Sequence, residues 1–498
     1  MNHRIFHVRS HCCGAIARST YLVWAVLFLV NIGNPRLSSA STNSPSHEVF
    51  IYAGHPLGFA LSFVGDLCGA PVSYVDPAYC YDSSRSRPSA PGRVGLIANE
   101  QEFSFQLDRD LDASMAISNV LAQFAQVEPQ VRFKVLIDTN LQMYAVLPIA
   151  WPGRSGEPNV SAFEMPLSYS NGEEKTRYQV IQDVLEMIAE RSPYEDTFKR
   201  GPMVGLGPGG SDMLAPLSFS GVPAYKVLNR LMSEKRKAWR VSRGGMFASG
   251  PHSLVMLSHP RVLSEKGRRA DRHILVSCPR PGNVALDVLQ EQYSTPIGYE
   301  GPDLSKEGRY TAVSGHDTIV GGQLEFDYSS TQSVENVLRE VFEVKKTRIA
   351  GTRFAVRKAG NSFYVSPSSV IGLSADWRQI LIPSESISQR QLSVTFQDTP
   401  LADAMSTVCI SLKQAYGIPI ELDAEAGTPW GNTRVSYEAK DLSVGEILSA
   451  CASQCEEPIS WRILYHPDRS GYLLSFRPVA MKGVDPLIMR RTQPHLDK

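Results

Sequence analysis

Ala53-Gly54-His55-Pro56-Leu57-Gly58-Phe59-Ala60-Leu61, continued by Pro71-Val72-Ser73-Tyr74, decides the organisation of this chain, because its skeleton returns twice further along. The second copy has the same spacing 225 residues later, and the third has four residues added between its two parts. An internal repeat of this kind indicates an array of modules, each one supersecondary unit. The matching residues are Pro281, Ala285, Leu286, Pro296, Ile297 and Tyr299 in the second copy, and Pro400, Ala404, Met405, Pro419 and Ile420 in the third.

Each copy predicts a strand, a helix and a second strand. Val49 to Tyr52 has strand character, and Pro56 suits the first turn of a helix, where its missing N–H is not needed. Apolar residues between Leu57 and Cys68 recur with helical spacing, which indicates one buried face. Gly69 is placed to end that helix. A similar unit follows, so the copy predicts two βαβ units in tandem.

The same pattern, read along the chain, divides it into four modules. We predict an α+β fold of tandem small βαβ–βαβ modules, each with two helices packed on one face of a small sheet. Module 2 is the most divergent, and long insertions interrupt the pattern at 82–101 and 193–216. The predicted segments are a signal peptide at 1–40, module 1 at 47–149, module 2 at 161–260, module 3 at 272–366, module 4 at 390–478 and a flexible tail at 479–498.

The charge of the chain gives no support to nucleic-acid binding. It has 50 basic and 50 acidic residues among 498, and four of the arginines fall in the first 40 residues, which have no acid. The rest therefore has 46 basic and 50 acidic residues, whereas affinity for nucleic acid depends on clustered positive charge.

The N-terminus predicts export. An arginine-containing lead precedes the apolar run from Tyr21 to Ile32, which is too short to span a bilayer as a helix. Ser38-Ser39-Ala40 then supplies the small residues that a signal peptidase reads. We expect a cleaved signal peptide and a periplasmic or secreted protein, with an uncleaved anchor as the alternative.

Six cysteines follow the predicted cleavage site, in a compartment where they could pair. Cys68 and Cys80 are close in sequence, and a disulfide between them would contribute about 3 kcal/mol in the chain-entropy model. Cys409 could pair with Cys451 or Cys455 if the two helices of module 4 lie side by side. The last two cysteines lack the second ligand pair of a zinc site, and we expect no metal and no cofactor.

Module 4 has the clearest resemblance to a known family. Its segments Thr399 to Met405, Gly417 to Asp423 and Leu442 to Leu448 resemble the short N-terminal domain of secretins and TonB-dependent receptors, and Ala53 to Leu61 matches the opening of that domain. The resemblance implies a periplasmic module that binds proteins or passes a signal, without catalysis. Too few residues follow 480 for the pore or receptor of those families, so it implies a stand-alone array.

This resemblance also implies the partners. They are envelope proteins, with secretin, pilus and TonB-type systems as the candidates, and no nucleic acid. We expect no integral membrane span after signal cleavage. Sheet edges and grooves between modules are the surfaces that such an array can offer to a strand or a helix of a partner.

An exported hydrolase is the alternative function. Ser314-Gly315-His316-Asp317 brings a hydroxyl, an imidazole and a carboxylate together, and Ser211-Asp212 follows a glycine-rich loop at 201–210. A nucleophile and its base meet through tertiary geometry, so adjacency in one loop is weak evidence for a site. An enzyme would have to bring His316 or His252 into a cleft with a nucleophile and an acid. We assign no catalytic residue.

Other polar residues of the repeat have simpler interpretations. We predict that His55 is a solvent-exposed loop residue, and that Asp76 and Asp303 are turn residues beside the prolines that end their strands. Trp239-Arg240 and Trp461-Arg462 fall at equivalent points of modules 2 and 4. Their equivalence predicts a shared packing role.

Overall fold

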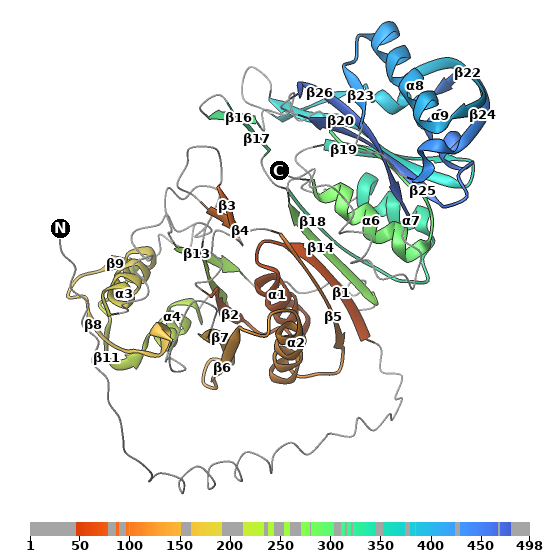
Figure 1. Ribbon diagram of the computed structural model, residues 1–498. Helices are drawn as coiled ribbons and strands as arrows, with labels where there is room; N and C mark the ends of the chain where they lie inside the picture. Colours follow the sequence, from red (N-terminus) through yellow and green to blue (C-terminus); the bar gives the residue numbers. More distant parts are fainter. Residues whose placement is uncertain are drawn as a thin grey trace, which may run out of the picture. The chain divides into compact units, whose positions relative to one another are not determined.

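The structure is a computed structural model that confirms the α+β class (Figure 1). Within the residues that it describes, no helix combines the length and the apolar content needed to cross a membrane. The predicted signal peptide and the tail from residue 480 lie outside them. The described residues are 46–77, 86–88, 96–98, 100–150, 161–191, 213–233, 238–243, 253–258, 270–278, 280–302, 310–313, 316–319, 322–344, 352–373, 379–383, 385–423, 429–466 and 469–479.

Module 1 follows the predicted order of two βαβ units. Pro56 occupies the first turn of its first helix, and Gly69 ends that helix in the left-handed region with φ +65°. Asp112 caps the second helix by accepting a hydrogen bond from the Met115 N–H at 2.9 Å. Its elements are β1 (Ser46–Ala53), α1 (Pro56–Cys68), β2 (Val72–Val75), β5 (Gln101–Asp108), α2 (Ala113–Val127), β6 (Arg132–Asp138) and β7 (Met143–Ala150).

Module 3 repeats this order, with Pro281 in the first helical turn and Ser294 ending the helix at φ +49°. Its strand β18 is not among the predicted elements, although Leu324, Phe326 and Tyr328 alternate with polar residues as in a half-buried strand. Its second helix is short and runs on into a π-helical turn at Glu340–Val344. The elements are β14 (Arg272–Cys278), α6 (Pro281–Tyr293), β15 (Ile297–Glu300), β18 (Gly322–Tyr328), α7 (Val334–Arg339), β19 (Thr352–Ala359) and β20 (Ser362–Leu373).

Modules 2 and 4 follow the same plan with differences. In module 2, the chain forms a 3-10 turn (η2) at Ala162–Glu164 before its first strand. Its described residues include no strand equivalent to β2. Module 2 has β8 (Pro166–Ser170), α3 (Arg177–Arg191), β11 (Ser218–Pro223), α4 (Ala224–Ser233), β12 (Ala238–Arg243) and β13 (Ser253–Ser258). Module 4 has β22 (Gln391–Pro400), α8 (Leu401–Tyr416), β23 (Ile420–Leu422), β24 (Arg434–Ser443), α9 (Val444–Ala452), β25 (Ile459–His466) and β26 (Gly471–Pro478).

Short elements connect these parts. Two hairpins pair only within themselves, and β21 adds to the far end of β20. Short helical turns lie at Ile387–Gln389 and Pro429–Asn432. The remaining strands are β3 (Ser86–Pro88), β4 (Leu96–Ala98), β9 (Lys175–Thr176), β10 (Met213–Leu214), β16 (Tyr310–Val313), β17 (His316–Ile319) and β21 (Gln379–Pro383).

The strands of a module lie in two sheets rather than in one. In module 1, β1 pairs with β5, while β2, β7 and β6 form a second group. Both helices pack between them, because the same core contains Ile51 and Phe105 from the first group and Val72 and Val146 from the second. Apolar residues on two sides of each helix make this arrangement possible, since both sides can be buried.

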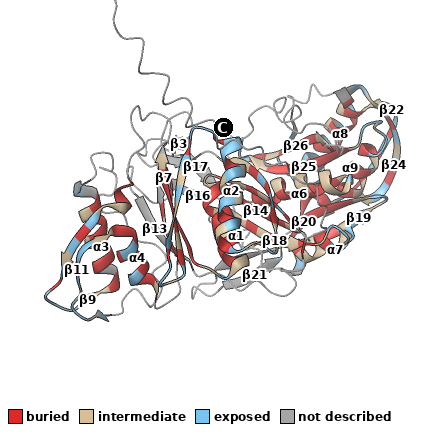
Figure 2. Cartoon of the chain, turned by 90° about the horizontal axis from the view of Figure 1, so that it is seen from below, coloured by how far each residue is buried: buried red, intermediate tan, exposed pale blue. Residues whose placement is uncertain are grey.

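The sheets are also shared between modules. The parallel pair β1–β14 joins modules 1 and 3 into one sheet of order β18-β14-β1-β5. Side chains that alternate along β1 then enter different cores: Val49 and Ile51 face module 1, and Phe50 and Tyr52 pack against module 3. This explains why the strand is apolar on both faces. Most residues of β14 and β25 are accordingly drawn as buried in Figure 2.

Candidate functional site

Two joints in the chain have the same geometry. Strand β12 of module 2 runs parallel to β2 of module 1, with Arg240 opposite Tyr74. Strand β25 of module 4 runs parallel to β15 of module 3, with Arg462 opposite Tyr299. The hydrogen bonds that follow are equivalent, from Asp76 N to Val241 O at 2.9 Å and from Gly301 N to Ile463 O at 2.8 Å. Each joint is therefore a strand of one module added to the sheet of the preceding module.

The helices of the joined modules cover opposite faces of the shared sheet. Along β7, Val146 belongs to the core of module 1, and its neighbours Ala145 and Leu147 belong to the core of module 2. Along β20, Val365 belongs to the core of module 3 and Tyr364 to that of module 4. Strand addition therefore creates a two-faced sheet, and burial of both faces stabilises the joint.

The tryptophan of each added strand has the same surroundings. Trp239 donates from Nε1 to Asn229 Oδ1 at 2.8 Å, and Trp461 donates to Ser449 Oγ at 3.0 Å. Both acceptors lie on the second helix of their own module, and both indoles are buried. The predicted shared packing role is confirmed for the two tryptophans by these contacts, since a buried indole N–H requires an acceptor.

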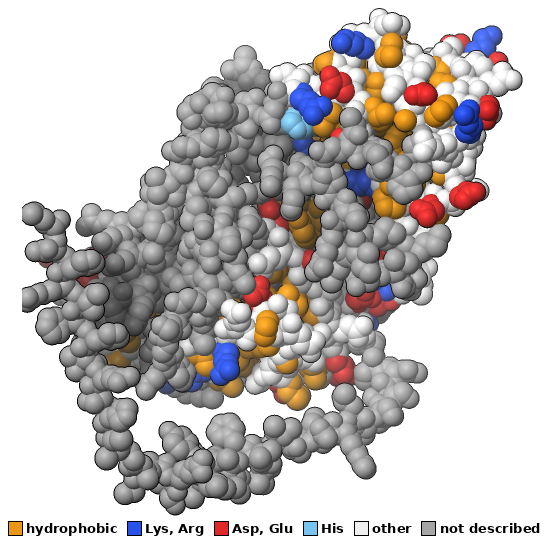
Figure 3. Space-filling model, in the orientation of Figure 1, with side chains coloured by type: hydrophobic (Ala, Val, Ile, Leu, Met, Phe, Trp, Pro, Cys, Tyr) orange, Lys and Arg blue, Asp and Glu red, His pale blue; other side chains and the backbone are white. Residues whose placement is uncertain are grey.

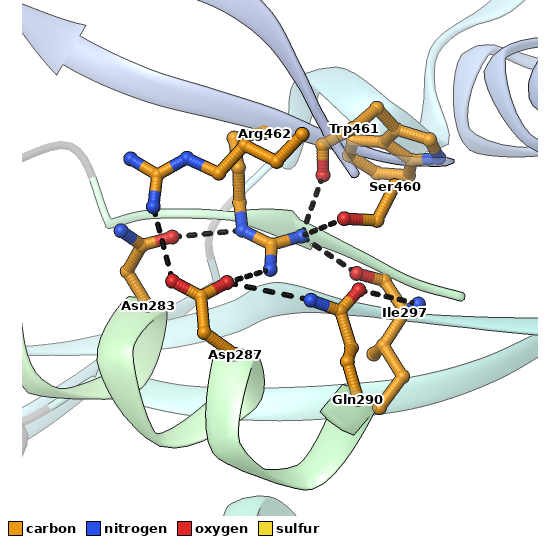
Figure 4. A network of polar contacts seen from close by, with 8 residues as sticks. Asn283, Asp287, Gln290, Ile297, Ser460, Trp461 and Arg462 are labelled. Carbon is orange, nitrogen blue, oxygen red and sulfur yellow. Dashed lines mark hydrogen bonds and ion pairs between the residues drawn. The ribbon is translucent and has the colours of Figure 1, made fainter. Parts of the chain in front are cut away.

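Arg462 reaches from β25 into module 3, where its side chain is fully buried (Figure 4). Its guanidinium donates to Asn283 Oδ1 at 2.8 Å, to Ile297 O at 2.7 Å and to Asp287 Oδ1 at 2.7 Å. Asp287 also pairs with Arg477 at 3.0 Å. Burial lowers the pKa of Arg462, and the carboxylate of Asp287 acts in the opposite direction. The network ties helix α6 to two strands of module 4.

Arg240 occupies the equivalent place in the first half, with different partners. Its guanidinium lies 4.9 Å from the centroid of the Phe59 ring and donates to His55 O at 3.4 Å. A Cβ on Gly58 would lie only 2.3 Å from the guanidinium carbon, so glycine is what leaves room for this side chain. Ser62 stands where module 3 has Asp287, and this helix therefore offers Arg240 no carboxylate at that position.

A buried His–Asp pair lies beside Arg240 and corrects two predictions. His55 is not a solvent-exposed loop residue, because only 15% of its side chain is exposed, and its Nδ1 lies 3.2 Å from Asp76 Oδ2. Asp76 is not a simple turn residue, since it is 1% exposed. Burial lowers the pKa of His55, and Asp76 acts in the opposite direction. Asp76 replaces Gly301 of module 3, so the acid of this joint lies at the strand end rather than on the helix.

One strand corresponds to β2 and β15 but has no added strand among the described residues. This is β23 of module 4, the last strand in the order β19-β20-β15-β25-β26-β23. It pairs with β26 in parallel, as β2 pairs with β7 and β15 with β20. Its other side is the side on which β2 of module 1 holds β12 and β15 of module 3 holds β25.

The hydrolase alternative stays untested. Ser211, Asp212, His252, Asp303 and Ser314 lie outside the described residues. His316 and Asp317 lie in β17, opposite Val313 and Ala312 of β16, and their side chains are likewise outside what the structure describes.

The cysteines and a polar depression offer no assembled chemistry either. Cys409 is not bonded to Cys451 or Cys455 in the structure. Cys80 lies outside the described ranges, so the Cys68–Cys80 disulfide stays a prediction. Among the described side chains, no group of three or more His, Cys, Asp and Glu is placed to hold a metal ion. A depression of about 450 Å³ at the start of β1 and β14 contains the ion pair Arg272–Glu48.

Comparison with known proteins adds no identity: no family model, no curated protein and no solved structure matches this chain.

Proposed function

We propose that this chain is an exported multi-module protein that binds or assembles other proteins of the cell envelope, without catalysing a reaction, as the periplasmic domains of secretins and TonB-dependent receptors do. One observation supports the proposal above the others. Both joints between consecutive modules are made by strand addition in the same register. A module that accepts a strand from its neighbour has the geometry needed to accept one from a partner protein.

The chemistry of the joints agrees with this proposal. Recognition in each case uses backbone pairing plus one tryptophan and one arginine, residue types that are enriched in binding interfaces. The signal peptide predicted at residues 1–40 supports a location in the envelope, and the resemblance of module 4 supplies the comparison with envelope assemblies.

In-cell photocrosslinking tests the proposal directly. A photoreactive residue placed at exposed Ile410 of α8, and separately at exposed Met115 of α2, would report partners at two modules. The proposal expects covalent adducts with one or a few defined envelope proteins. Fractionation that finds the chain in the cytoplasm with its first 40 residues intact, or the absence of adducts at both positions, would refute it. Turnover of ester or peptide substrates by the purified chain would favour the hydrolase instead.

A further inference from the structure

The free side of β23 has the same arrangement of backbone groups as the strands that accept β12 and β25 in the two internal joints. Tyr472 N donates to Pro419 O at 2.7 Å and Asp423 N to Leu474 O at 2.9 Å, so alternate residues of this segment bond β26. In a parallel pair the residues between them point their N–H and C=O groups the other way. The outward residues are therefore Ile420 and Leu422.

The internal acceptors have the same alternation. Tyr144 N donates to Pro71 O at 3.0 Å, and Phe363 N donates to Pro296 O at 3.3 Å, which matches the bond to Pro419. Counting from each proline, Leu422 is the equivalent of Tyr74 and Tyr299, the residues that face Arg240 and Arg462 of the added strands. The register of an added strand on β23 is thereby defined: its basic residue lies opposite Leu422.

We propose, on the basis of the function proposed above, that β23 accepts a parallel strand from a different protein, with an aromatic residue, then Arg or Lys, then a β-branched residue. Trp239-Arg240-Val241 and Trp461-Arg462-Ile463 are the two strands of this type that the chain adds to its own modules. The aromatic residue packs on the helices of its own module, and the basic residue crosses to the helix of the acceptor.

Charge complementarity supports a basic residue in the partner strand. The third residue after the proline of the acceptor helix is Phe59 in module 1, where its ring contacts Arg240, and Asp403 in module 4. Asp403 is exposed in the first turn of α8. Glu421, on β23 itself, is 69% exposed and pairs only with the exposed Arg469 within the described residues. Asp403 thus lies on the helix that a docking cation would approach, whereas Glu421 alternates with Ile420 and Leu422, which pack on the core of module 4, and points to the opposite face of β23.

The described residues include one further strand of this type, but its surroundings argue against a second copy as the partner. Phe133-Lys134-Val135 lies in β6, at the edge of the sheet β13-β12-β2-β7-β6. Lys134 is paired with Glu164 of module 2 at 2.6 Å, and Leu136 packs against the core of module 2. The face that would have to meet α8 of another copy is therefore occupied by module 2 of its own chain.

The described surface of module 4 is also not purely apolar. The described surface of module 4, at the upper right of Figure 3, shows acidic and basic side chains interspersed with apolar ones. A three-residue strand offers few backbone hydrogen bonds. The side chains of the partner strand, and the ion pair above all, must therefore supply much of the specificity.

A peptide binding experiment with the full chain tests the inference. The probe is a fluorescein-labelled, blocked peptide with the sequence of Ile459–His466, and the matched probe has Arg462→Glu. Fluorescence anisotropy should show saturable binding of the first probe, with about tenfold weaker binding of the second, the equivalent of one partly shielded ion pair. Asp403→Lys in the chain should reverse that preference. Glu438→Lys, an exposed carboxylate on β24 of the same module, should leave it unchanged.

The strand edge itself is tested by Leu422→Pro, which removes an outward N–H and should abolish binding of the first probe. Circular dichroism and a thermal melt check that the Leu422→Pro variant stays folded. If it does not, the Asp403→Lys experiment still tests the inference, because it does not use that variant. Equal binding of both probes to the unchanged chain would overturn the inference. So would concentration-dependent self-association that Asp403→Lys abolishes, because the partner would then be a second copy. Failure here with successful envelope crosslinking would leave the proposed function intact.

Discussion

Replacing Asp287 by alanine gives the sharpest test of the joint between modules 3 and 4. The change removes the only carboxylate that pairs with Arg462 within the described residues, while the guanidinium stays fully buried. Removing one partner of a buried ion pair costs about 3–5 kcal/mol. Because 32% of Asp287 is exposed to screening water, and Arg462 keeps neutral acceptors at Asn283 and Ile297, we expect about 2 kcal/mol.

Hydrogen exchange measured by mass spectrometry suits this prediction, because a chain of several modules need not unfold in one step. Protection of β25 should fall about 30-fold, the equivalent of 2 kcal/mol. Protection of β12 should not change. Ser62→Ala, at the equivalent position of module 1, is the matched control. The double variant Asp287→Ala/Arg462→Met should recover most of the loss, since it leaves no unpaired buried charge. A double variant no better protected than Asp287→Ala would refute the reasoning.

Three further predictions concern packing, pH and capping. Gly298→Ala should destabilise the joint by about 1–3 kcal/mol, measured as lost hydrogen-exchange protection of β15, because its Cβ would lie 2.2 Å from the rigid Trp461 ring. Gly172→Ala, with no atom within 4 Å of its Cβ, should have almost no effect. Burial, with a smaller effect of a nearby arginine, lowers the pKa of His47 from 6.5 to about 4. The unfolded chain therefore binds a proton at this histidine before the folded chain does, and stability should fall as pH drops from 6.5 to 4, by up to about 1.4 kcal/mol per pH unit. His47→Gln should flatten a plot of melting temperature against pH. Ser443→Ala should cost about 1 kcal/mol by breaking the capping box of α9, measured as lost protection of that helix in hydrogen exchange.

The sequence was sufficient for the elements whose signals are local. Pro56 and Pro281 start helices where the repeat places them, and Gly69 ends one in the left-handed region. The periodicity of the helices predicted their buried faces, because a 3.6-residue repeat of apolar positions is readable without tertiary information. The α+β class follows from the same signals.

The sharing of sheets between modules could not be predicted in this way. Phe50 and Tyr52 are apolar because β1 is covered on both faces, but an apolar strand has the same sequence whether its second face meets its own module or another. His55 and Asp76 are far apart in sequence and meet only because β2 ends beside the start of α1. Their pairing depends on tertiary structure, and a lone histidine before a proline gives no signal of it.

The contacts indicate that the repeating unit of this chain is a joined pair of modules rather than a single module. Modules 1 and 3 share the unbroken spacing of the opening motif, and modules 2 and 4 share the tryptophan and arginine of the added strand. Each joint has one carboxylate near its arginine or histidine, but on the helix as Asp287 in one half and at the strand end as Asp76 in the other. The carboxylate has a different position in the two joints, whereas the register of the added strand is the same. Strand addition is therefore the feature that the two joints share. The same feature is the basis on which we propose β23, the acceptor strand of the last module, as a binding site for another protein.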